Sequence, residues 1–97
     1  MIVHIVMFAF KEENKRENLK RAKEMLEALV EKIPSLLSME VGLDFMQSER
    51  SFDLVLTSTF ENKEGLSSYA TDPAHLEVVG FIKEVTEGAK VVDYEKS

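Results

Sequence analysis

Apolar residues occupy nearly every position of residues 2–10, the first segment of the chain. β-Branched and aromatic side chains dominate it, which is typical of a β-strand. The odd positions carry Val3, Ile5, Met7 and Ala9, and the even positions carry Ile2, His4, Val6, Phe8 and Phe10. Because both faces of this strand are apolar, we expect both to be covered in the folded protein.

A long amphipathic helix is predicted over residues 13–33. Its apolar positions form one stripe on a 3.6-residue period, made of Leu19, Ala22, Met25, Leu26, Leu29, Val30 and Ile33. Pro34 stops this helix, since its ring removes a helical hydrogen bond and disfavours helical backbone at Ile33. One such helix covers only one face of a sheet.

Two further strands are predicted at residues 37–46 and 52–60, joined by a polar hairpin loop at 47–51. In the first, Met39, Val41, Leu43 and Phe45 share a face. In the second, the shared face carries Phe52, Leu54, Leu56, Ser58 and Phe60. This alternation predicts strands with one apolar and one more polar side.

Two short helices and a last strand complete the pattern. Asn62 is the expected N-cap of a helix whose buried side includes Leu66, Tyr69 and Ala70. Asp72 and Pro73 are a second start signal, for a helix over residues 72–87. We expect Gly88 to end that helix with a positive φ, before a strand over residues 89–94.

The predicted order is β-α-β-β-α-β, which is the split-βαβ or ferredoxin-like arrangement of the α+β class. It places four antiparallel strands in one sheet, with both helical regions on one face, within a single domain over residues 1–97. Nothing else in the chain can cover the second apolar face of the first strand. A second copy is the economical cover, so the sequence predicts a homodimer that packs sheet against sheet.

Composition and charge narrow the classes of function. The apolar fraction of 44% and the charged fraction of 31% are those of an ordinary globular protein. The absence of cysteine excludes disulfides, thiol nucleophiles and thiolate metal sites. A formal charge of −6 argues against nucleic-acid binding. No signal peptide and no membrane-spanning run is recognisable, so we expect a cytoplasmic protein that neither binds nor crosses a membrane.

The only two histidines, His4 and His75, are the candidate chemical groups. His75 falls in the first turn of the helix that Asp72 and Pro73 begin, and Val78, Val79 and Ile82 follow at helical spacing on the core side. His75 is therefore either a satisfied core residue or a pocket group. A metal site would need a carboxylate from Asp72, Asp93 or Glu77, without recognisable ligand spacing, so neither a metal nor a cofactor is predicted.

Several short motifs, in their order and spacing, resemble one known family across nearly the whole chain. They are the start Ile2-Val3-His4-Ile5-Val6-Met7-Phe8, the helix end Ile33-Pro34, Val41-Gly42, Phe52-Asp53-Leu54-Val55-Leu56, Ser58-Thr59-Phe60, Tyr69, Asp72-Pro73-Ala74-His75 and Val91-Val92-Asp93-Tyr94. The chain resembles the stress-responsive α/β-barrel domains, often called Dabb, which form dimeric α+β barrels. That resemblance implies the same fold and a homodimer.

The resemblance also implies candidate site residues. In plant relatives that are polyketide cyclases, a histidine after a Pro-Ala pair acts with a tyrosine six residues earlier, and these positions match His75 and Tyr69. A first-strand histidine matches His4. In that chemistry the histidine removes a proton next to a carbonyl and the tyrosine hydroxyl stabilises the enolate. The alternative is that these histidines only tie the helices to the sheet.

The leading functional hypothesis is a pocket between sheet and helices that binds a small apolar or aromatic molecule, with a role in the stress response. One alternative is a cyclase-like enzyme with His75 as base, Tyr69 as oxyanion stabiliser and His4 beside them. The other is a cofactor-free monooxygenase, by analogy with wider dimeric α+β barrels, some of which instead bind haem through a histidine.

Overall fold

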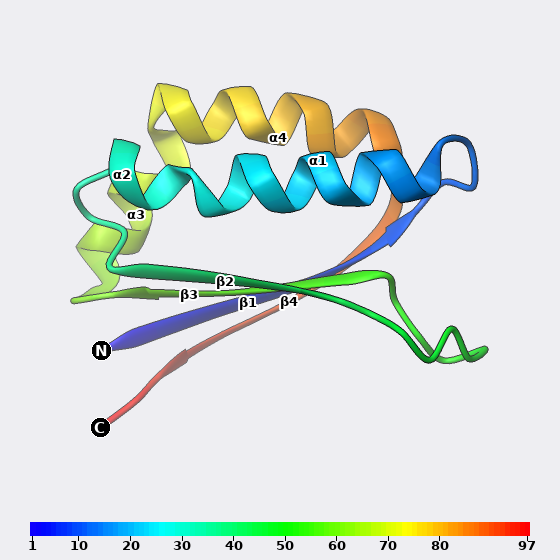
Figure 1. The fold of residues 1–97 in the computed structure, drawn as a ribbon. Helices are drawn as coiled ribbons and strands as arrows, with labels where there is room; N and C mark the ends of the chain where they lie inside the picture. The colour runs from blue at the N-terminus through cyan, green and yellow to red at the C-terminus, as the bar shows by residue number, and fades with distance from the viewer.

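The computed structural model describes all residues 1–97, and its four strands form one antiparallel sheet in the order β2-β3-β1-β4 (Figure 1). This is the predicted ferredoxin-like fold. Its elements are β1 (Ile2–Phe10), α1 (Lys15–Glu27), α2 (Leu29–Lys32), β2 (Ser38–Leu43), β3 (Leu54–Phe60), α3 (Lys63–Thr71), α4 (Pro73–Val85) and β4 (Thr86–Glu95).

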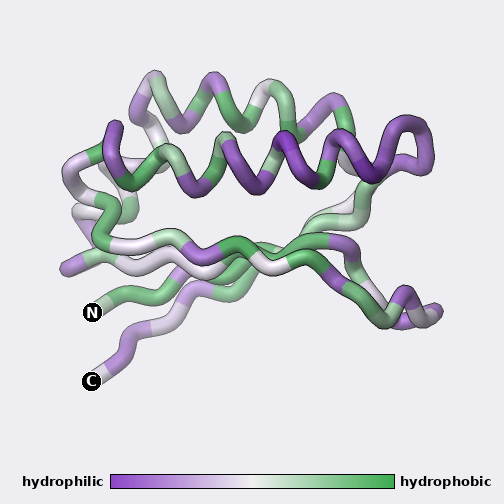
Figure 2. Tube along the Cα trace, viewed as in Figure 1, coloured by the Kyte–Doolittle hydropathy of each residue, from purple (hydrophilic) through white to green (hydrophobic).

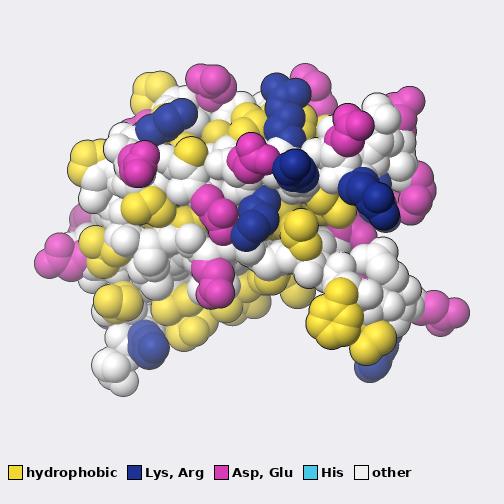
Figure 3. All heavy atoms as spheres, viewed as in Figure 1, with side chains coloured by type: hydrophobic (Ala, Val, Ile, Leu, Met, Phe, Trp, Pro, Cys, Tyr) yellow, Lys and Arg dark blue, Asp and Glu magenta, His cyan; other side chains and the backbone are white.

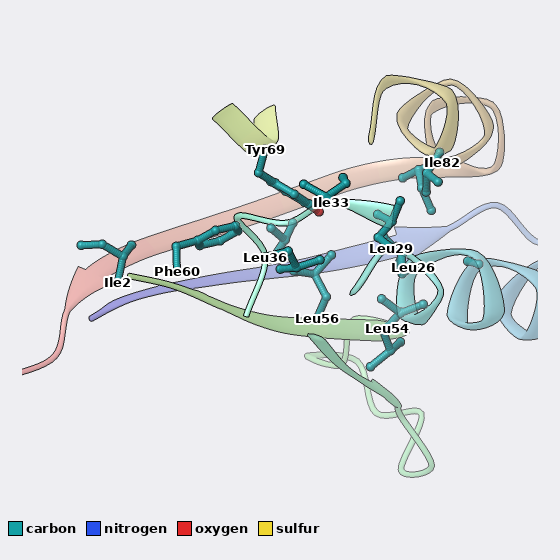
Figure 4. Close-up of a cluster of buried hydrophobic side chains, with 14 of the residues drawn as sticks. Ile2, Leu26, Leu29, Ile33, Leu36, Leu54, Leu56, Phe60, Tyr69 and Ile82 are labelled. Carbon is teal, nitrogen blue, oxygen red and sulfur yellow. The ribbon is translucent and has the colours of Figure 1, made fainter. Parts of the chain in front are cut away.

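All helices lie on one face of the sheet (Figure 1). The even-numbered β1 residues Ile2, Val6 and Phe10 belong to the core cluster that also contains residues of these helices. β1 is an interior strand whose pairing aligns Ile2 with Phe60 and Val6 with Leu56 of β3. These side chains meet Leu26 and Leu29 from the α1–α2 region in one buried cluster (Figure 4). The shared face predicted for Leu54, Leu56, Ser58 and Phe60 in β3 is confirmed, since all four side chains are buried.

The opposite face of the sheet, which we call the outer face, has no helix over it (Figure 1). Along the chain β1 is hydrophobic almost throughout, while α1 alternates between hydrophobic and hydrophilic positions (Figure 2). The outer face carries Ile5 and Met7 from β1, paired with Val92 of β4 and Val55 of β3. Apolar side chains are visible along this underside (Figure 3). β1 is thus apolar on both of its sides, as its pattern predicts, while the flanking strands add polar side chains such as Thr57 and Lys90 to the outer face.

The long first helix differs from its prediction at its start and near its end. It begins at Lys15, because Asn14 adopts a left-handed conformation with φ of 52° that interrupts the helix. A one-residue interruption at Ala28 separates α1 from α2. The predicted stop is correct, since α2 ends at Lys32 and Ile33 before Pro34 is extended.

The predicted role of Gly88 is wrong. The last helix, α4, ends at Val85, and Thr86 is extended and donates its hydroxyl to the Ile82 carbonyl at 2.8 Å, which satisfies one of the free C=O groups. Gly88 lies inside β4 opposite Ala9, and no glycine has a positive φ. β4 is therefore longer than predicted.

The second strand is shorter than predicted. β2 ends at Leu43, and Phe45, expected on the apolar face beside Val41, lies in the β2–β3 loop with 90% of its surface exposed. Asp44 ends the strand, because its carboxylate accepts the Gln47 N–H at 2.7 Å and turns the chain.

Asp53 joins the start of β3 to the end of β1. Its carboxylate is buried and accepts the Phe10 N–H at 2.7 Å, while Lys15 approaches the other oxygen at 3.4 Å. Its own N–H donates to the Phe8 carbonyl at 2.9 Å. Asp53 therefore provides an acceptor for a buried backbone N–H and a charge partner for Lys15 at the point where the sheet and the first helix meet.

We predict that Asp53→Ala lowers the free energy of unfolding by about 1–3 kcal/mol, because the buried Phe10 N–H loses its acceptor. Asp53→Asn keeps an acceptor oxygen and loses less. Urea unfolding followed by circular dichroism measures both. Equal stability of Asp53→Ala and the unmodified protein would show that the bond contributes nothing.

Candidate functional site

Asp72 forms the joint between α3 and α4. Its carboxylate accepts the Ala74 N–H at 2.8 Å and caps α4, with Pro73 in the first helical turn. Its own N–H donates to the Tyr69 carbonyl at 3.1 Å and closes α3. The predicted helix start is confirmed, and one residue both ends a helix and begins the next.

This joint brings Tyr69 and His75 together. Residues six apart on an uninterrupted helix point about 240° apart, at ~100° per residue. Across the break at Asp72 their ring centroids lie 4.2 Å apart at an angle of 41°. The aromatic contact therefore depends on the helix ending and restarting at this point.

The partner of His75 decides which of its nitrogens carries the proton. Nδ1 lies 3.2 Å from the Ala70 carbonyl oxygen, which can only accept a hydrogen bond. Nδ1 is therefore the protonated atom of the neutral ring, and Nε2 carries the free lone pair. Burial lowers the pKa of His75 below its ordinary value of 6.5, with a smaller contribution from nearby His4. The ring is thus held as a neutral base.

Tyr69 points from α3 into the core, where only 2% of its surface is exposed (Figure 4). Its ring packs 5.1 Å from the Phe60 ring. Burial raises the pKa of the phenol to about 12, so the hydroxyl stays protonated near neutral pH. It is a hydrogen-bond donor rather than a base.

His4 reaches the same region from the sheet. It lies on the helix-facing side of β1, opposite Asp93 of β4, and its Nδ1 is hydrogen-bonded to the Asp93 carboxylate. A carboxylate orients the ring and selects the tautomer with the proton on Nδ1, which leaves Nε2 free. From the sequence, Asp93 is suggested as a possible metal ligand and as part of the motif Val91-Val92-Asp93-Tyr94, but not as a partner of His4. The antiparallel pairing of the first and last strands is the signal that pairs it with His4.

His4, Tyr69 and His75 line one cavity of about 270 Å³ between the sheet and α4. The remaining walls are mostly apolar, and they include Val6, Phe8, Leu26, Leu56, Val79 and Ile82. Lys83 also borders the cavity, from the far end of α4. The structure therefore brings together all three residues that the sequence singled out and adds Asp93 and Lys83. No group of three His, Asp or Glu side chains is arranged to hold a metal ion.

Comparison with known proteins agrees with this architecture. The family model described as the stress responsive A/B barrel domain matches residues 2–96. The chain belongs to the stress-responsive A/B barrel domain family. A stress-response A/B barrel domain-containing protein of Arabidopsis thaliana is 29% identical over 94 residues, which are 94% of this chain and 82% of that protein.

Solved structures place this A/B barrel domain among dimeric ferredoxin-like proteins. A dimeric protein of unknown function from Bacteroides fragilis is 33% identical, with a TM-score of 0.90 over 98% of this chain and 95% of that one. A putative antibiotic biosynthesis monooxygenase from Nitrosomonas europaea shares the fold at 20% identity, with a TM-score of 0.79 over 99% of this chain and 98% of that one. No helix of this A/B barrel domain has the length and apolar character to span a membrane.

We predict that His75 makes this domain less stable as the pH falls. The unfolded chain takes up a proton on His75 near pH 6.5, whereas the folded chain resists it to lower pH. The unfolded state then binds more protons, so this contribution to stability is complete above about pH 6.5 and declines below it.

His75→Asn is the matched variant, since its amide can still donate to the Ala70 carbonyl but does not titrate. The melting temperature of the unmodified protein minus that of His75→Asn should be smaller at about pH 5 than at about pH 8. A difference that grows on acidification would show that the folded protein prefers the charged ring.

Proposed function

We propose that this chain is a cytoplasmic homodimer with a role in the stress response, and that its pocket binds a small aromatic molecule. The observation that carries the proposal is the convergence of His4, Tyr69 and His75, from three separate elements, on one apolar cavity. Few, well-placed polar groups in an apolar pocket are the usual form of a small-molecule site.

The walls indicate the shape of the ligand. A cavity of about 270 Å³ suits a compact molecule of one or two rings. The tilted rings of Tyr69 and His75 and the side chain of Phe8 make part of the wall aromatic, which suits contact with another ring. Two free Nε2 atoms and one phenol hydroxyl are available to its polar atoms.

Lys83 indicates the charge of the ligand. It follows His75 by eight residues on α4, or about 12 Å along the helix axis at 1.5 Å per residue. Its side chain borders the cavity and takes part in no ion pair. An aromatic acid whose anionic group lies at this end would gain a charge partner and keep its ring among the apolar walls.

The outer face supports the homodimer. Met7, Val55, Val92 and Tyr94 are each at least one-third exposed there in the single chain. The relative from Bacteroides fragilis is described as dimeric. Sheet-to-sheet packing of two copies would remove this apolar surface from water at roughly 25 cal/mol per Å².

Two fluorescent probes test the pocket. Naphthalene-1-sulfonate and naphthalene share their two rings and differ in the sulfonate. We expect both to bind the unmodified protein and Val79→Phe, which fills the cavity, to abolish both. Lys83→Met should weaken binding of the sulfonate probe by up to about fivefold, as expected for a solvent-exposed charge pair, and leave the neutral probe unchanged.

Lys20→Met on the exposed surface of α1 is the control, with the same change in net charge. Probe binding that survives Val79→Phe would place the probes elsewhere and contradict the pocket. If Lys83→Met and Lys20→Met change the affinity for the sulfonate probe equally, the proposed anionic group of the ligand is contradicted, but the pocket is not.

A second candidate function is acid–base catalysis of the cyclase type, which the state of the Tyr69–His75 pair favours. His75 is a neutral base with Nε2 free, and Tyr69 is a protonated donor beside it. Nε2 would take a proton from the carbon next to a carbonyl, which converts the substrate into an enolate. The enolate oxygen would accept a hydrogen bond from the Tyr69 hydroxyl. His4, whose ring is oriented by Asp93, lines the same cavity.

The test is exchange of the methyl protons of 4-acetylbenzoate for deuterium in heavy water. The exchange is monitored by the loss of the methyl signal in the proton NMR spectrum. The protein should accelerate exchange, and His75→Asn should reduce the rate about a hundredfold or more, the usual contribution of a general base. Tyr69→Phe should lower the rate more than the affinity. Exchange at the buffer rate would reject catalysis and leave a binding pocket. The monooxygenase alternative has only the shared fold in its support.

A further inference from the structure

The loop of residues 44–53, which we call the β2–β3 arm, exposes two large apolar side chains. Phe45 is 90% exposed and Met46 is 67% exposed. Single exposed apolar residues are common, but a neighbouring pair on a projecting loop is a typical mark of an interaction site. Phe45 and Met46 are therefore candidate contacts for a partner.

The arm is held by its own hydrogen bonds. At its base, the Asp44 N–H donates to the Asp53 carbonyl at 2.9 Å. Further out, Gln47 donates to the Asp44 carboxylate from its N–H at 2.7 Å and from its amide at 3.0 Å. Near the tip, the hydroxyls of Ser48 and Ser51 lie 2.8 Å apart. Local polar contacts thus fix the backbone and leave Phe45 and Met46 pointing into solvent.

The arm bends away from the helices, beyond the plane of the sheet (Figure 1). Its apolar side chains project on the same side as the apolar underside of the sheet (Figure 3). Between the arm and the outer face lies a hollow of about 420 Å³, bordered by Met7, Val55, Phe45 and Phe52. The arm and the outer face therefore form one continuous concave surface.

We propose that the β2–β3 arm clasps a second copy of this chain, with Phe45 and Met46 as its contacts. The inference rests on the proposed sheet-to-sheet homodimer and adds the element that holds its edge. In a two-fold dimer each copy offers the same surface, so one pairing engages two arms and fills two hollows. The pairing closes on itself and leaves no unpaired arm.

The dimensions suit one partner of this kind. The two longer extents of the molecule, 35 and 27 Å, bound a face of roughly 900 Å². A stable protein–protein interface buries about 800 Å² on each partner. The outer face with its arm is thus large enough for a complete interface with one copy.

The charge of the arm disfavours a lipid surface as the occupant. The arm carries Asp44, Glu49 and Asp53 against the single cation Arg50, and the whole chain has a formal charge of −6. Anionic membranes attract basic segments rather than acidic ones. A second copy of the chain is the partner that the apolar arm and hollow fit.

The experiment measures the dimer dissociation constant by sedimentation velocity over a dilution series. Phe45→Ser should weaken the dimer tenfold or more, as truncation of a buried aromatic anchor does. Leu76→Ser is the matched control, since Leu76 is 53% exposed on α4, on the helix side. It should leave the constant unchanged. Circular dichroism should show both variants folded, because neither side chain is in the core.

Val92→Lys on the outer face separates this inference from the dimer itself. If Val92→Lys is monomeric but Phe45→Ser dimerises as tightly as the unmodified protein, the clasp is overturned and the sheet-to-sheet dimer is kept. A Val92→Lys protein that dimerises normally would overturn both. Phe45-dependent sedimentation with phosphatidylcholine–phosphatidylserine vesicles, without any change in the dimer constant, would assign the arm to a membrane instead and overturn the clasp.

Discussion

The structure depends on the need to bury both faces of β1. This interior strand has no polar side, and full burial of each large apolar side chain stabilises the fold by about 1.5–3 kcal/mol. The helix layer meets this need on one side, where Ile2, Val6 and Phe10 are buried. On the other side the single chain supplies no cover. One strand therefore requires a helix layer above the sheet and leaves apolar side chains such as Met7 exposed below it.

The pocket results from an incomplete fit between that helix layer and the sheet. α4 covers β1 and β4 only in part, and His4, Tyr69 and His75 lie where the packing leaves space. Asp72 controls this arrangement through two hydrogen bonds: its carboxylate accepts the Ala74 N–H of α4, and its own N–H donates to the Tyr69 carbonyl of α3. Without the break that it produces, Tyr69 and His75 would point in different directions and the polar groups would not converge. A local capping interaction thus becomes a property of the site.

The protonation states in the pocket follow from its surroundings more than from residue type. The Ala70 carbonyl and the Asp93 carboxylate each accept a hydrogen bond from a histidine Nδ1, so both rings present the same free atom, Nε2. Burial keeps His75 neutral and Tyr69 protonated. The pocket therefore combines a base with a donor, which suits recognition of a carbonyl or an acid and, if substrate geometry allows, transfer of a proton.

The sequence by itself determined the order of elements, the apolar character of both sides of β1, the capping role of Asp72 and the choice of His4, Tyr69 and His75. These depend on short-range periodicity and on the hydrogen-bonding needs of helix ends, which adjacent residues specify. The tertiary structure alone decided that Gly88 belongs to β4, that Phe45 leaves the sheet, and that Asp93 and Lys83 border or support the site. Those outcomes depend on strand register and on contacts between residues far apart in the chain. His4 and Asp93 are separated by 89 positions and meet only when β1 pairs with β4.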